Sequence, residues 1–290
     1  MNVLSTKGFP DYEFIDSGNG QRLERFGKFI LVRPDQQIIW KPKKDNSVWE
    51  KADASYIQNG SKGAWYNRGK VPDKWLLKYK NLSFFCKLTP FKHTGVFPEQ
   101  SLQWDFMSEI LSSMPKEKIQ PSVLNLFGYT GVSSLICAAN GAKVTHLDAS
   151  HPAIGWAREN QEASGLMQKP IRWILDDALK FTQREVKRNV KYDAIIMDPP
   201  IYGHGPEGER WDFNESFPKL MEICKKILSA NPLFVIVNAY AISSSSIMLN
   251  NVLKDYLGDL GGTFEYGELA LQERDGDRLL STGIFARWFK

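Results

Sequence analysis

The chain has 290 residues, of which 42% are hydrophobic and 24% charged, and its formal net charge is +4. This length suits one large or two modest domains. No apolar run approaches the roughly 20 residues needed to cross a bilayer, and residues 1–10 do not have the apolar core of a signal peptide. The three cysteines, Cys86, Cys137 and Cys224, have no metal-ligand spacing. We therefore expect them to be small buried hydrophobes in a reducing, cytoplasmic setting.

Residues 1–90 are predicted to form a small, mostly antiparallel β domain. Residues 22–33 and 37–40 have strand-like composition, and Pro34-Asp35 between them suggests a hairpin. Residues 74–88 contain two further stretches that favour strands.

The N-terminal part is also where the positive charge gathers. Residues 1–115 carry 17 Lys and Arg against 12 Asp and Glu, and residues 41–80 alone carry 10 against 4. Interleaved with this stretch are six aromatic residues: Trp49, Tyr56, Trp65, Tyr66, Trp75 and Tyr79. Basic side chains beside aromatic rings suit RNA, because they neutralise phosphates and stack on bases. A lysine-rich solvated face over a small β core is the alternative, and it stays open.

Residues 91–290 are predicted to form an open α/β sheet. A helix is expected first, over residues 100–114, where apolar side chains recur at helical spacing. Five apolar runs of strand length follow, separated by helix-length segments: 123–127, 143–147, 171–175, 192–197 and 233–237. Polar residues come directly after several of these runs, which predicts a ligand site at the carboxyl edge of the sheet.

A tight glycine turn follows the first of these strands. It occupies residues 128–131 and leads into a helix over residues 132–140, and Asp148 ends the next strand. In such a unit the glycines let the backbone approach a ligand at the helix N-terminus, and the acid accepts bonds from ribose hydroxyls. A dinucleotide needs G-x-G-x-x-G around its pyrophosphate, whereas only Gly128 and Gly131 are present, so S-adenosylmethionine fits better than NAD. A purely structural turn, with Asp148 as a helix cap, is the alternative.

The third strand is also followed by acids. Asp177 could accept a bond from the adenine amine, and Ala178 could offer its backbone N–H to a ring nitrogen. The alternative for this position is a helix N-cap, a role that Asp176 could also fill.

The fourth strand ends in Asp198-Pro199-Pro200-Ile201-Tyr202. Two successive prolines make a stiff, extended backbone that would hold the Asp198 carboxylate at a fixed distance from a methyl donor. Tyr202 could stack on a base, and the glycine-rich stretch at residues 203–208 is expected to be a mobile loop that closes over substrate. A strand terminator followed by a surface loop is the plainer interpretation.

Together these motifs resemble the class I S-adenosylmethionine-dependent methyltransferases and, within them, the RlmI/RlmK-type 23S rRNA methyltransferase family. The resemblance covers about residues 80–290. It is carried by Lys92-His93-Thr94-Gly95-Val96-Phe97-Pro98-Glu99-Gln100, Asn125-Leu126-Phe127-Gly128-Tyr129-Thr130-Gly131, Asp148-Ala149-Ser150, Asp177-Ala178 and Asp198-Pro199-Pro200-Ile201-Tyr202.

The resemblance implies a Rossmann-like seven-stranded sheet whose last two strands form a C-terminal hairpin, for which residues 264–272 and 279–288 are the candidates. The residues that we expect to bind the donor are Phe97, Glu99, Phe127, Gly128, Tyr129, Thr130, Gly131, Asp148, Ala149, Ser150, Asp177, Ala178 and Asp198. The catalytic candidates are Asp198, Pro199, Pro200 and Tyr202.

Two departures from the family pattern limit the prediction. The family's N-terminal RNA-binding domain of the PUA type has no visible equivalent here, so RNA binding would depend on residues 41–80. Relatives that methylate cytosine C5 carry a cysteine after the fourth or fifth strand, whereas this chain has Asp198-Pro199-Pro200 and Asn238-Ala239-Tyr240. We therefore expect direct methyl transfer to nitrogen or oxygen by positioning, without a dedicated base.

The sequence thus predicts an S-adenosylmethionine-dependent methyltransferase that acts on RNA, most plausibly ribosomal RNA. A protein or small-molecule methyltransferase and a non-catalytic cofactor-binding protein are the alternatives. No metal and no membrane partner is expected, and the oligomeric state is open.

Overall fold

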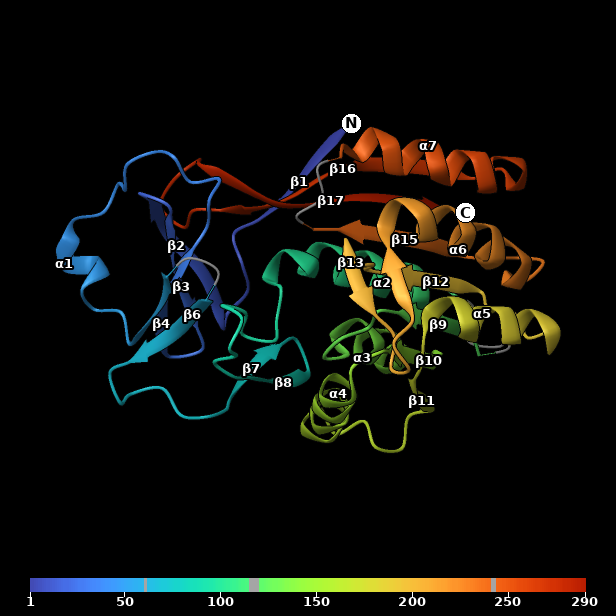
Figure 1. Cartoon of the computed structure of the whole chain (residues 1–290), viewed down its shortest axis with the longest axis horizontal. Coiled ribbons are helices and arrows are strands. Elements are labelled where there is room, and N and C mark those ends of the chain that lie inside the picture. Colours follow the sequence, from blue (N-terminus) through green and yellow to red (C-terminus); the bar gives the residue numbers. More distant parts are fainter. Residues whose placement is uncertain (60–61, 115–119, 241–243) are drawn as a thin grey trace. The chain divides into compact units, whose positions relative to one another are not determined.

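The computed structural model describes residues 1–59, 62–114, 120–240 and 244–290. Two compact units make up the chain (Figure 1). Unit 1 comprises Met1–Leu4, Gln103–Leu269 and Thr282–Lys290, and unit 2 comprises Ser5–Leu102 and Ala270–Ser281. Unit 2 thus extends past residue 90 and takes in a C-terminal segment, because Glu273 accepts a hydrogen bond from Ser17 (2.6 Å) and Lys44 pairs with Asp275 (2.7 Å).

The sheet of unit 1 confirms the predicted α/β class. Among the described residues it has eight strands, in the order β1-β16-β17-β15-β12-β9-β10-β11. Their bounds are β1 Asn2–Thr6, β9 Ser122–Leu126, β10 Lys143–Asp148, β11 Ile171–Leu175, β12 Ala194–Met197, β15 Phe234–Ala239, β16 Thr263–Gln272 and β17 Leu279–Phe289. The strands β15, β12, β9, β10 and β11 run parallel, and β17 is antiparallel to β15. All five strands predicted from apolar runs are present, and the last two strands of the chain are neighbours in the sheet.

The described sheet has one strand more than the seven expected. β1 lies at the edge beside β16, although the sequence placed residues 1–90 in the small domain. The two backbones approach closely, because a Cβ on Gly267 would lie 1.6 Å from the Asn2 carbonyl oxygen. Five residues of mixed polarity carry too weak a pattern to predict this edge strand.

Helices cover both faces of this sheet. They are α2 Ser101–Ser113, α3 Val132–Ala139, α4 His151–Ala163, α5 Ala178–Lys187, α6 Phe213–Ile227 and α7 Ser246–Leu257. Helices α5, α6 and α7 lie in a row over one face (Figure 1) and pack on a core that includes Leu124 and Leu126. Asn125, between these two residues, donates to Ser134 of α3 (2.9 Å), so α3 lies on the opposite face. No helix in the described ranges is long and apolar enough to span a bilayer.

Unit 2 is β-rich and mostly antiparallel, as predicted. Its described strands form one sheet in the order β2-β3-β4-β5-β6 and a separate β7-β8 pair. Their bounds are β2 Tyr12–Gly18, β3 Gln21–Phe26, β4 Phe29–Pro34, β5 Ala54–Asn59, β6 Lys62–Asn67, β7 Trp75–Tyr79 and β8 Leu82–Cys86. The pairing of β4 with β5 is parallel, and a short helix, α1 (Asn46–Trp49), lies between these two strands in the chain.

The predicted hairpin through Pro34-Asp35 is wrong. Residues 22–33 are not one strand, because β3 and β4 pair with each other and Phe26 lies opposite Phe29. Gly27 has a φ of +65° and makes the tight turn between them, a conformation that glycine adopts without steric cost. Residues 37–40 form no strand.

Candidate active site

The predicted site residues of unit 1 meet at the carboxyl edge of its sheet. β9 lies between β12 and β10, and Leu126 is opposite both Met197 and Leu147. Asp148 is in turn opposite Leu175 of β11. After β11 the chain crosses to the other side of β9, so the strand order reverses between β9 and β12. Open α/β sheets bind their ligands at such a switch point.

The turn after β9 is held in an unusual backbone conformation. Phe127 and Tyr129 have φ values of +56° and +50°, and Gly131 has +82°. Left-handed backbone at a bulky residue costs about 1–3 kcal/mol, and such strain gathers at ligand clamps. The turn is tied to the next strand, because the Gly128 N–H donates to the Leu147 carbonyl (2.9 Å). Ligand binding by residues 127–131 stays a prediction, which this strained and tied backbone favours.

Asp148 is fixed at the end of β10 by backbone donors. Its Oδ2 accepts from the Tyr129 N–H and its Oδ1 from the Ser150 N–H, each at 2.8 Å. Ser150, not Asp148, is the N-cap of α4, because its Oγ accepts from the Ala153 N–H (3.3 Å). Burial raises the pKa of Asp148, and the N–H groups of Ser150 and Tyr129 oppose that rise. The half-buried carboxylate is thus held in a fixed orientation, and its contact with a ribose stays a prediction.

A buried polar cluster beneath the turn was not predicted. His146 is fully buried in β10, and its Nδ1 lies 2.9 Å from the Ser134 Oγ, which also accepts from Asn125. A Cβ on Gly128 would lie 2.3 Å from the His146 Cε1, so the imidazole takes the space that glycine leaves. Burial lowers the pKa of His146 to about 3 and keeps the ring neutral. A lone histidine within an apolar strand was the available sequence signal.

Asp177 begins α5 as its N-cap. Its Oδ1 accepts from the Lys180 N–H (2.8 Å), and Ala178 is the first residue of the helix. Asp176 is not the cap, since it accepts from the Asp177 N–H (2.8 Å) and pairs with Arg184. Capping uses one carboxylate oxygen of Asp177 and orients the group, so the other oxygen can still accept from an amine. Contact with adenine therefore stays a prediction.

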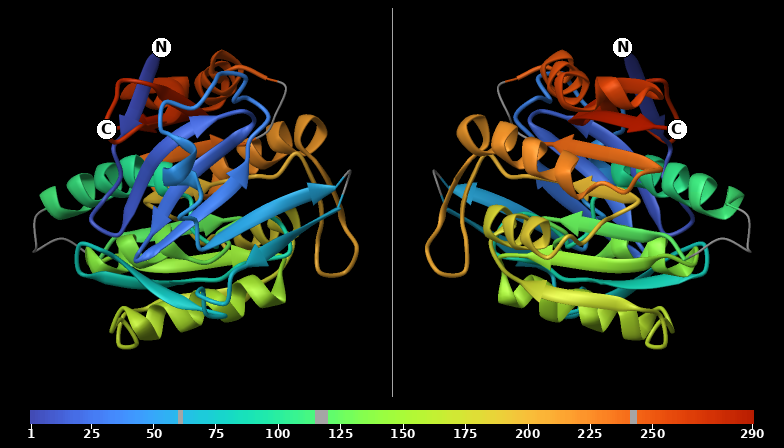
Figure 2. Two further views of the ribbon diagram at one scale, coloured as in Figure 1. Left: turned by 90° about the vertical axis from the view of Figure 1, so that its left-hand side faces the viewer. Right: turned by 90° about the vertical axis from the view of Figure 1, so that its right-hand side faces the viewer.

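The Asp198-Pro199-Pro200 stretch leads into a two-stranded ribbon rather than the predicted loop. β13 (Tyr202–His204) pairs antiparallel with β14 (Arg210–Asp212), and the ribbon extends away from the sheet (Figure 2). Trp211 anchors it, because its Nε1 donates to the Pro200 carbonyl (2.7 Å) and its ring meets Phe127 edge-on at 4.8 Å. The segment that follows Asp198 is therefore packed against the turn at residues 127–131.

A second polar network ends at Asn238, which lies beside Asp198 because β15 and β12 are neighbours. The Asn238 Oδ1 accepts from Gln103 of α2 (3.1 Å), and the Gln103 Oε1 accepts from Arg287 of β17 (3.1 Å). Arg287 is buried and makes two bonds to Glu265, at 2.8 and 2.6 Å. Sequence reasoning missed Gln103 and Arg287, although one arginine in an otherwise apolar strand was a usable signal.

Phe97 and Glu99 belong to unit 2. Glu99 lies in a 3-10 turn, Pro98–Gln100, and is 3% exposed; burial raises its pKa. Phe97 is half-buried, and its ring lies 5.3 Å from that of His93. Arg33 holds the start of this segment by donating to the Lys92 carbonyl (3.3 Å). Donor contacts of Phe97 and Glu99 remain predictions.

The aromatic residues of the basic 41–80 stretch mostly serve the β core. Tyr56, Trp75 and Tyr79 are each less than 9% exposed. Trp49 and Trp65 are half-buried, and their ring N–H groups donate to Asp16 and to the Thr89 carbonyl. Tyr66 differs from the other five, being 59% exposed. Of these six rings, Tyr66 is therefore the one open to base stacking. Several of the lysines are engaged in ion pairs, Lys43 with Glu273, Lys44 with Asp275 and Lys70 with Asp53.

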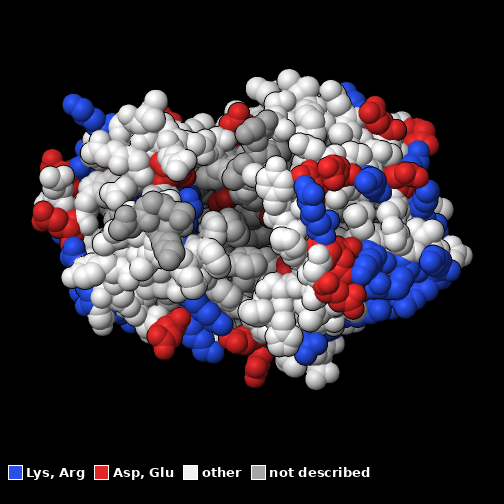
Figure 3. Space-filling view, viewed as in Figure 1, with Lys and Arg blue, Asp and Glu red and all other residues white. Residues whose placement is uncertain are grey.

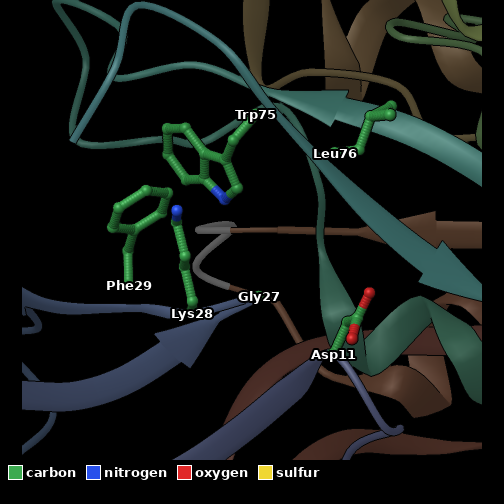
Figure 4. A pocket seen from close by; sticks show the side chains of 6 residues that line it. All are labelled: Asp11, Gly27, Lys28, Phe29, Trp75 and Leu76. Atoms are coloured by element: carbon green, nitrogen blue, oxygen red, sulfur yellow. The ribbon is translucent and has the colours of Figure 1, made fainter.

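An open pocket of about 480 Å³ occupies unit 2 (Figure 4). It is lined by Asp11, Gly27, Lys28, Phe29, Trp75 and Leu76. Phe29 and Trp75 are nearly buried and meet edge-on at 5.5 Å, so they present little ring face to a ligand. None of the predicted site residues lines this pocket, and we assign it no cofactor.

The three cysteines are all buried and free. Burial raises the pKa of each thiol, that of Cys137 to about 12. Cys137 lies in α3 and Cys224 in α6, and neither follows a strand end of the site.

The parallel sheet with an antiparallel β17, the strained glycine turn and the acid at the end of the next strand define a Rossmann-like methyltransferase fold. Residues 87–257 match the model of the Methyltransferase small domain family, and the chain belongs to this family. It is 40% identical to the SAM-dependent methyltransferase from Agrobacterium tumefaciens, over 100% of this chain and 93% of that one, with a TM-score of 0.96. The chain is therefore a methyltransferase that uses S-adenosylmethionine, as predicted.

Two further relatives are curated proteins. The chain is 32% identical over 150 residues to the Ribosomal RNA large subunit methyltransferase K/L of Shewanella frigidimarina, and 30% identical over 203 residues to that of Shewanella loihica. These alignments span 51% and 69% of this chain, but only 20% and 25% of the relatives.

Proposed function

We propose that this enzyme methylates RNA of the large ribosomal subunit, at a nitrogen or an oxygen. The observation that carries the proposal is the 30% identity, over 203 residues, with an enzyme named as a large-subunit rRNA methyltransferase. The exposed Tyr202, two positions after Pro200, supports it, because an open aromatic ring close to Asp198-Pro199-Pro200 suits a base. A ribosomal substrate would place the activity in the cytoplasm.

The donor would be held by residues at the ends of β9, β10 and β11. Asp148 would accept the ribose hydroxyls, because both of its oxygens are already oriented by backbone N–H groups. Asp177 and the N–H of Ala178 would contact adenine, and the turn at residues 127–131 would lie against the rest of the donor. S-adenosylmethionine supplies a methyl group on a sulfonium that carries its own leaving group.

The acceptor would be positioned by the end of β12. Transfer needs the acceptor lone pair to approach the methyl carbon in line, so orientation is the main task of the protein. Pro199 and Pro200 stiffen the backbone, and Asp198 would accept a bond from an amine N–H. Asn238, whose carbonyl oxygen accepts from Gln103, adds a second polar group at the same strand edge.

Burial of the cysteines supports nitrogen or oxygen as the target. Methylation at cytosine C5 needs a thiolate that attacks the ring, and only the thiolate is a good nucleophile. The three thiols are buried and their pKa values are raised, so none is suited to that role.

The test is methyl transfer from radiolabelled S-adenosylmethionine to RNA and protein of cells in which the gene is deleted. We expect label in large-subunit rRNA with the wild-type enzyme, and its loss with Asp198→Ala. Label in protein or in small molecules, with none in RNA, would overturn the proposal in favour of another methyl acceptor.

A further inference from the structure

The β13–β14 ribbon presents two different faces. Tyr202 is opposite Asp212 and His204 is opposite Arg210, so these side chains alternate with Gly203 and Trp211 and share one face. Tyr202 is 69% exposed and the Arg210 side chain 73%, whereas Trp211 is 4% exposed. The face that carries Trp211 thus packs against the protein, and the face that carries Tyr202 and Arg210 is exposed to solvent. We call Tyr202, His204 and Arg210 the outer face.

The ribbon is held in place by contacts at its base and at its tip. At its base Trp211 binds the Pro200 carbonyl and contacts Phe127. At its tip the Gly205 N–H donates to the Glu209 carbonyl (2.7 Å). Lys180 of α5 pairs with both Glu207 and Glu209 and so ties the tip to the helix. An arm held at both ends can present side chains at a defined distance from Asp198.

Arg210 is the positively charged residue of the outer face, and Asp212 lies on the same side of the ribbon. The acidic residues at the tip, Glu207 and Glu209, both pair with Lys180, and Figure 3 shows acidic side chains directly beside the Lys and Arg of α5. Asp212 is engaged as the N-cap of α6, accepting from the Asn214 N–H (3.0 Å) and the Glu215 N–H (3.3 Å). Arg210 lies 3.9 Å from Asp212, beyond hydrogen-bond distance. The contact is an ion pair without a hydrogen bond, so the guanidinium N–H groups of Arg210 can still donate to an anion.

An open aromatic ring, an imidazole and an arginine on one narrow ribbon match single-stranded RNA. Bases stack on aromatic rings, and arginine binds phosphate through two parallel bonds. Double-stranded RNA does not offer the same contacts, because its bases are stacked on one another and its major groove is too narrow for side chains to read.

We propose that the outer face of the β13–β14 ribbon binds the unpaired RNA that flanks the acceptor nucleotide. Tyr202 stacks on a base, Arg210 contacts a backbone phosphate, and His204 lies between them. The inference rests on the proposed RNA substrate and adds to it the strand state of that RNA and the residues that recognise it.

The experiment measures binding of a fluorescein-labelled, mixed-sequence single-stranded RNA by anisotropy, at several salt concentrations and with saturating S-adenosylhomocysteine. We expect Tyr202→Ala to weaken binding by roughly tenfold or more, with the salt dependence unchanged, and Tyr202→Phe to retain binding. Arg210→Ala should lower the slope of log K against log salt by about 0.7, the loss of one phosphate contact. The matched control is Arg188→Ala, since the Arg188 side chain is also exposed (53%) but lies at the far end of α5.

The same RNA annealed to its complement should bind more weakly than the single strand. If the wild-type enzyme methylates rRNA while Tyr202→Ala and Arg210→Ala bind the probe as the wild type does, the ribbon inference is overturned and the proposed function stands. If the wild-type enzyme neither binds the probe nor labels RNA, the proposed function fails, and the ribbon inference fails with it.

Discussion

The two sides of the switch point between β9 and β12 are built in opposite ways. On the donor side, the turn at residues 127–131 and Asp148 are shaped by backbone bonds, and the cluster around His146 supports them from below. On the proposed acceptor side, the candidate groups are the Asp198 carboxylate and exposed side chains of the ribbon, among them Tyr202, which is 69% exposed.

This contrast follows from what each side has to recognise. The donor is one molecule, and a rigid backbone cradle can match its ribose and adenine. The proposed RNA acceptor has to arrive, be oriented and leave as part of a larger substrate, so we expect its contacts to be exposed side chains of the ribbon. The variants below ask whether the two sides can be disturbed separately.

The largest effect is expected on the acceptor side. Asp198→Ala should lower kcat by about 100-fold, because the acceptor loses the group that orients it, while the Kd for S-adenosylhomocysteine stays close to normal. Single-turnover transfer and isothermal titration measure the two quantities. Retained turnover would remove Asp198 from the acceptor role, and weakened donor binding would show that the two sides are not separate.

On the donor side, Asp148→Ala should weaken S-adenosylhomocysteine binding by about 1–3 kcal/mol, the cost of losing a charged hydrogen-bond partner. The exposed Glu222, which pairs with Lys226 on α6, provides the control Glu222→Ala, for which titration should show no change. Wild-type affinity in Asp148→Ala would contradict the ribose assignment.

The pH dependence of donor affinity is a second test of the ribose assignment of Asp148. Burial raises the pKa of this carboxyl above its ordinary value, and the ionised form is the better acceptor for ribose hydroxyls. Donor affinity should therefore be full above the raised pKa and fall as the pH drops through it. The stability of the unliganded protein should change in the opposite direction. It should fall as the pH rises through the same range, because the folded state binds the Asp148 proton more tightly than the unfolded state does. Asp148→Asn should abolish the pH dependence of donor affinity, which calorimetry at several pH values will check.

The close approach of Gly128 to His146 predicts coupling between these two residues. Gly128→Ala should destabilise the turn by about 1–3 kcal/mol, because the new Cβ would lie 2.3 Å from the His146 Cε1. In Gly128→Ala combined with His146→Ala, the ring is gone and part of the donor affinity should return. A double-mutant cycle on the Kd measures the coupling, and simple additivity would show that the imidazole does not shape the turn.

The smallest effect is expected from Gln103→Ala. It removes the link between Arg287 and Asn238 and should cost about 1 kcal/mol of stability, with a few-fold lower kcat and an unchanged donor Kd. Ser112→Ala, on the exposed end of the same helix, is the control. A changed Kd for S-adenosylhomocysteine would show that the Gln103 network supports donor binding and not only the acceptor side.

Local patterns determined most of the sheet and the donor turn. Apolar runs of strand length, a glycine turn and an acid at the next strand end lie close together in sequence, so their chemistry is visible without a fold. The same kind of local pattern gave a wrong prediction for residues 22–33. It predicted a turn at Pro34-Asp35, whereas the turn lies at Gly27. An apolar stretch that contains a glycine can be one strand or two, and only pairing decides.

What the tertiary structure alone decided are the contacts between segments distant in the chain. The edge strand β1 pairs with β16, Arg287 reaches Gln103 across 184 positions, and Lys180 ties down the tip of the ribbon. The burial of individual side chains could not be predicted from the sequence either. The aromatic residues of 41–80 look alike in sequence, although Tyr66 is exposed and Trp75 is not. The physical reason is that strand ends and turns are specified by neighbouring residues, whereas burial and long-range bonds depend on which surfaces meet after the chain has folded.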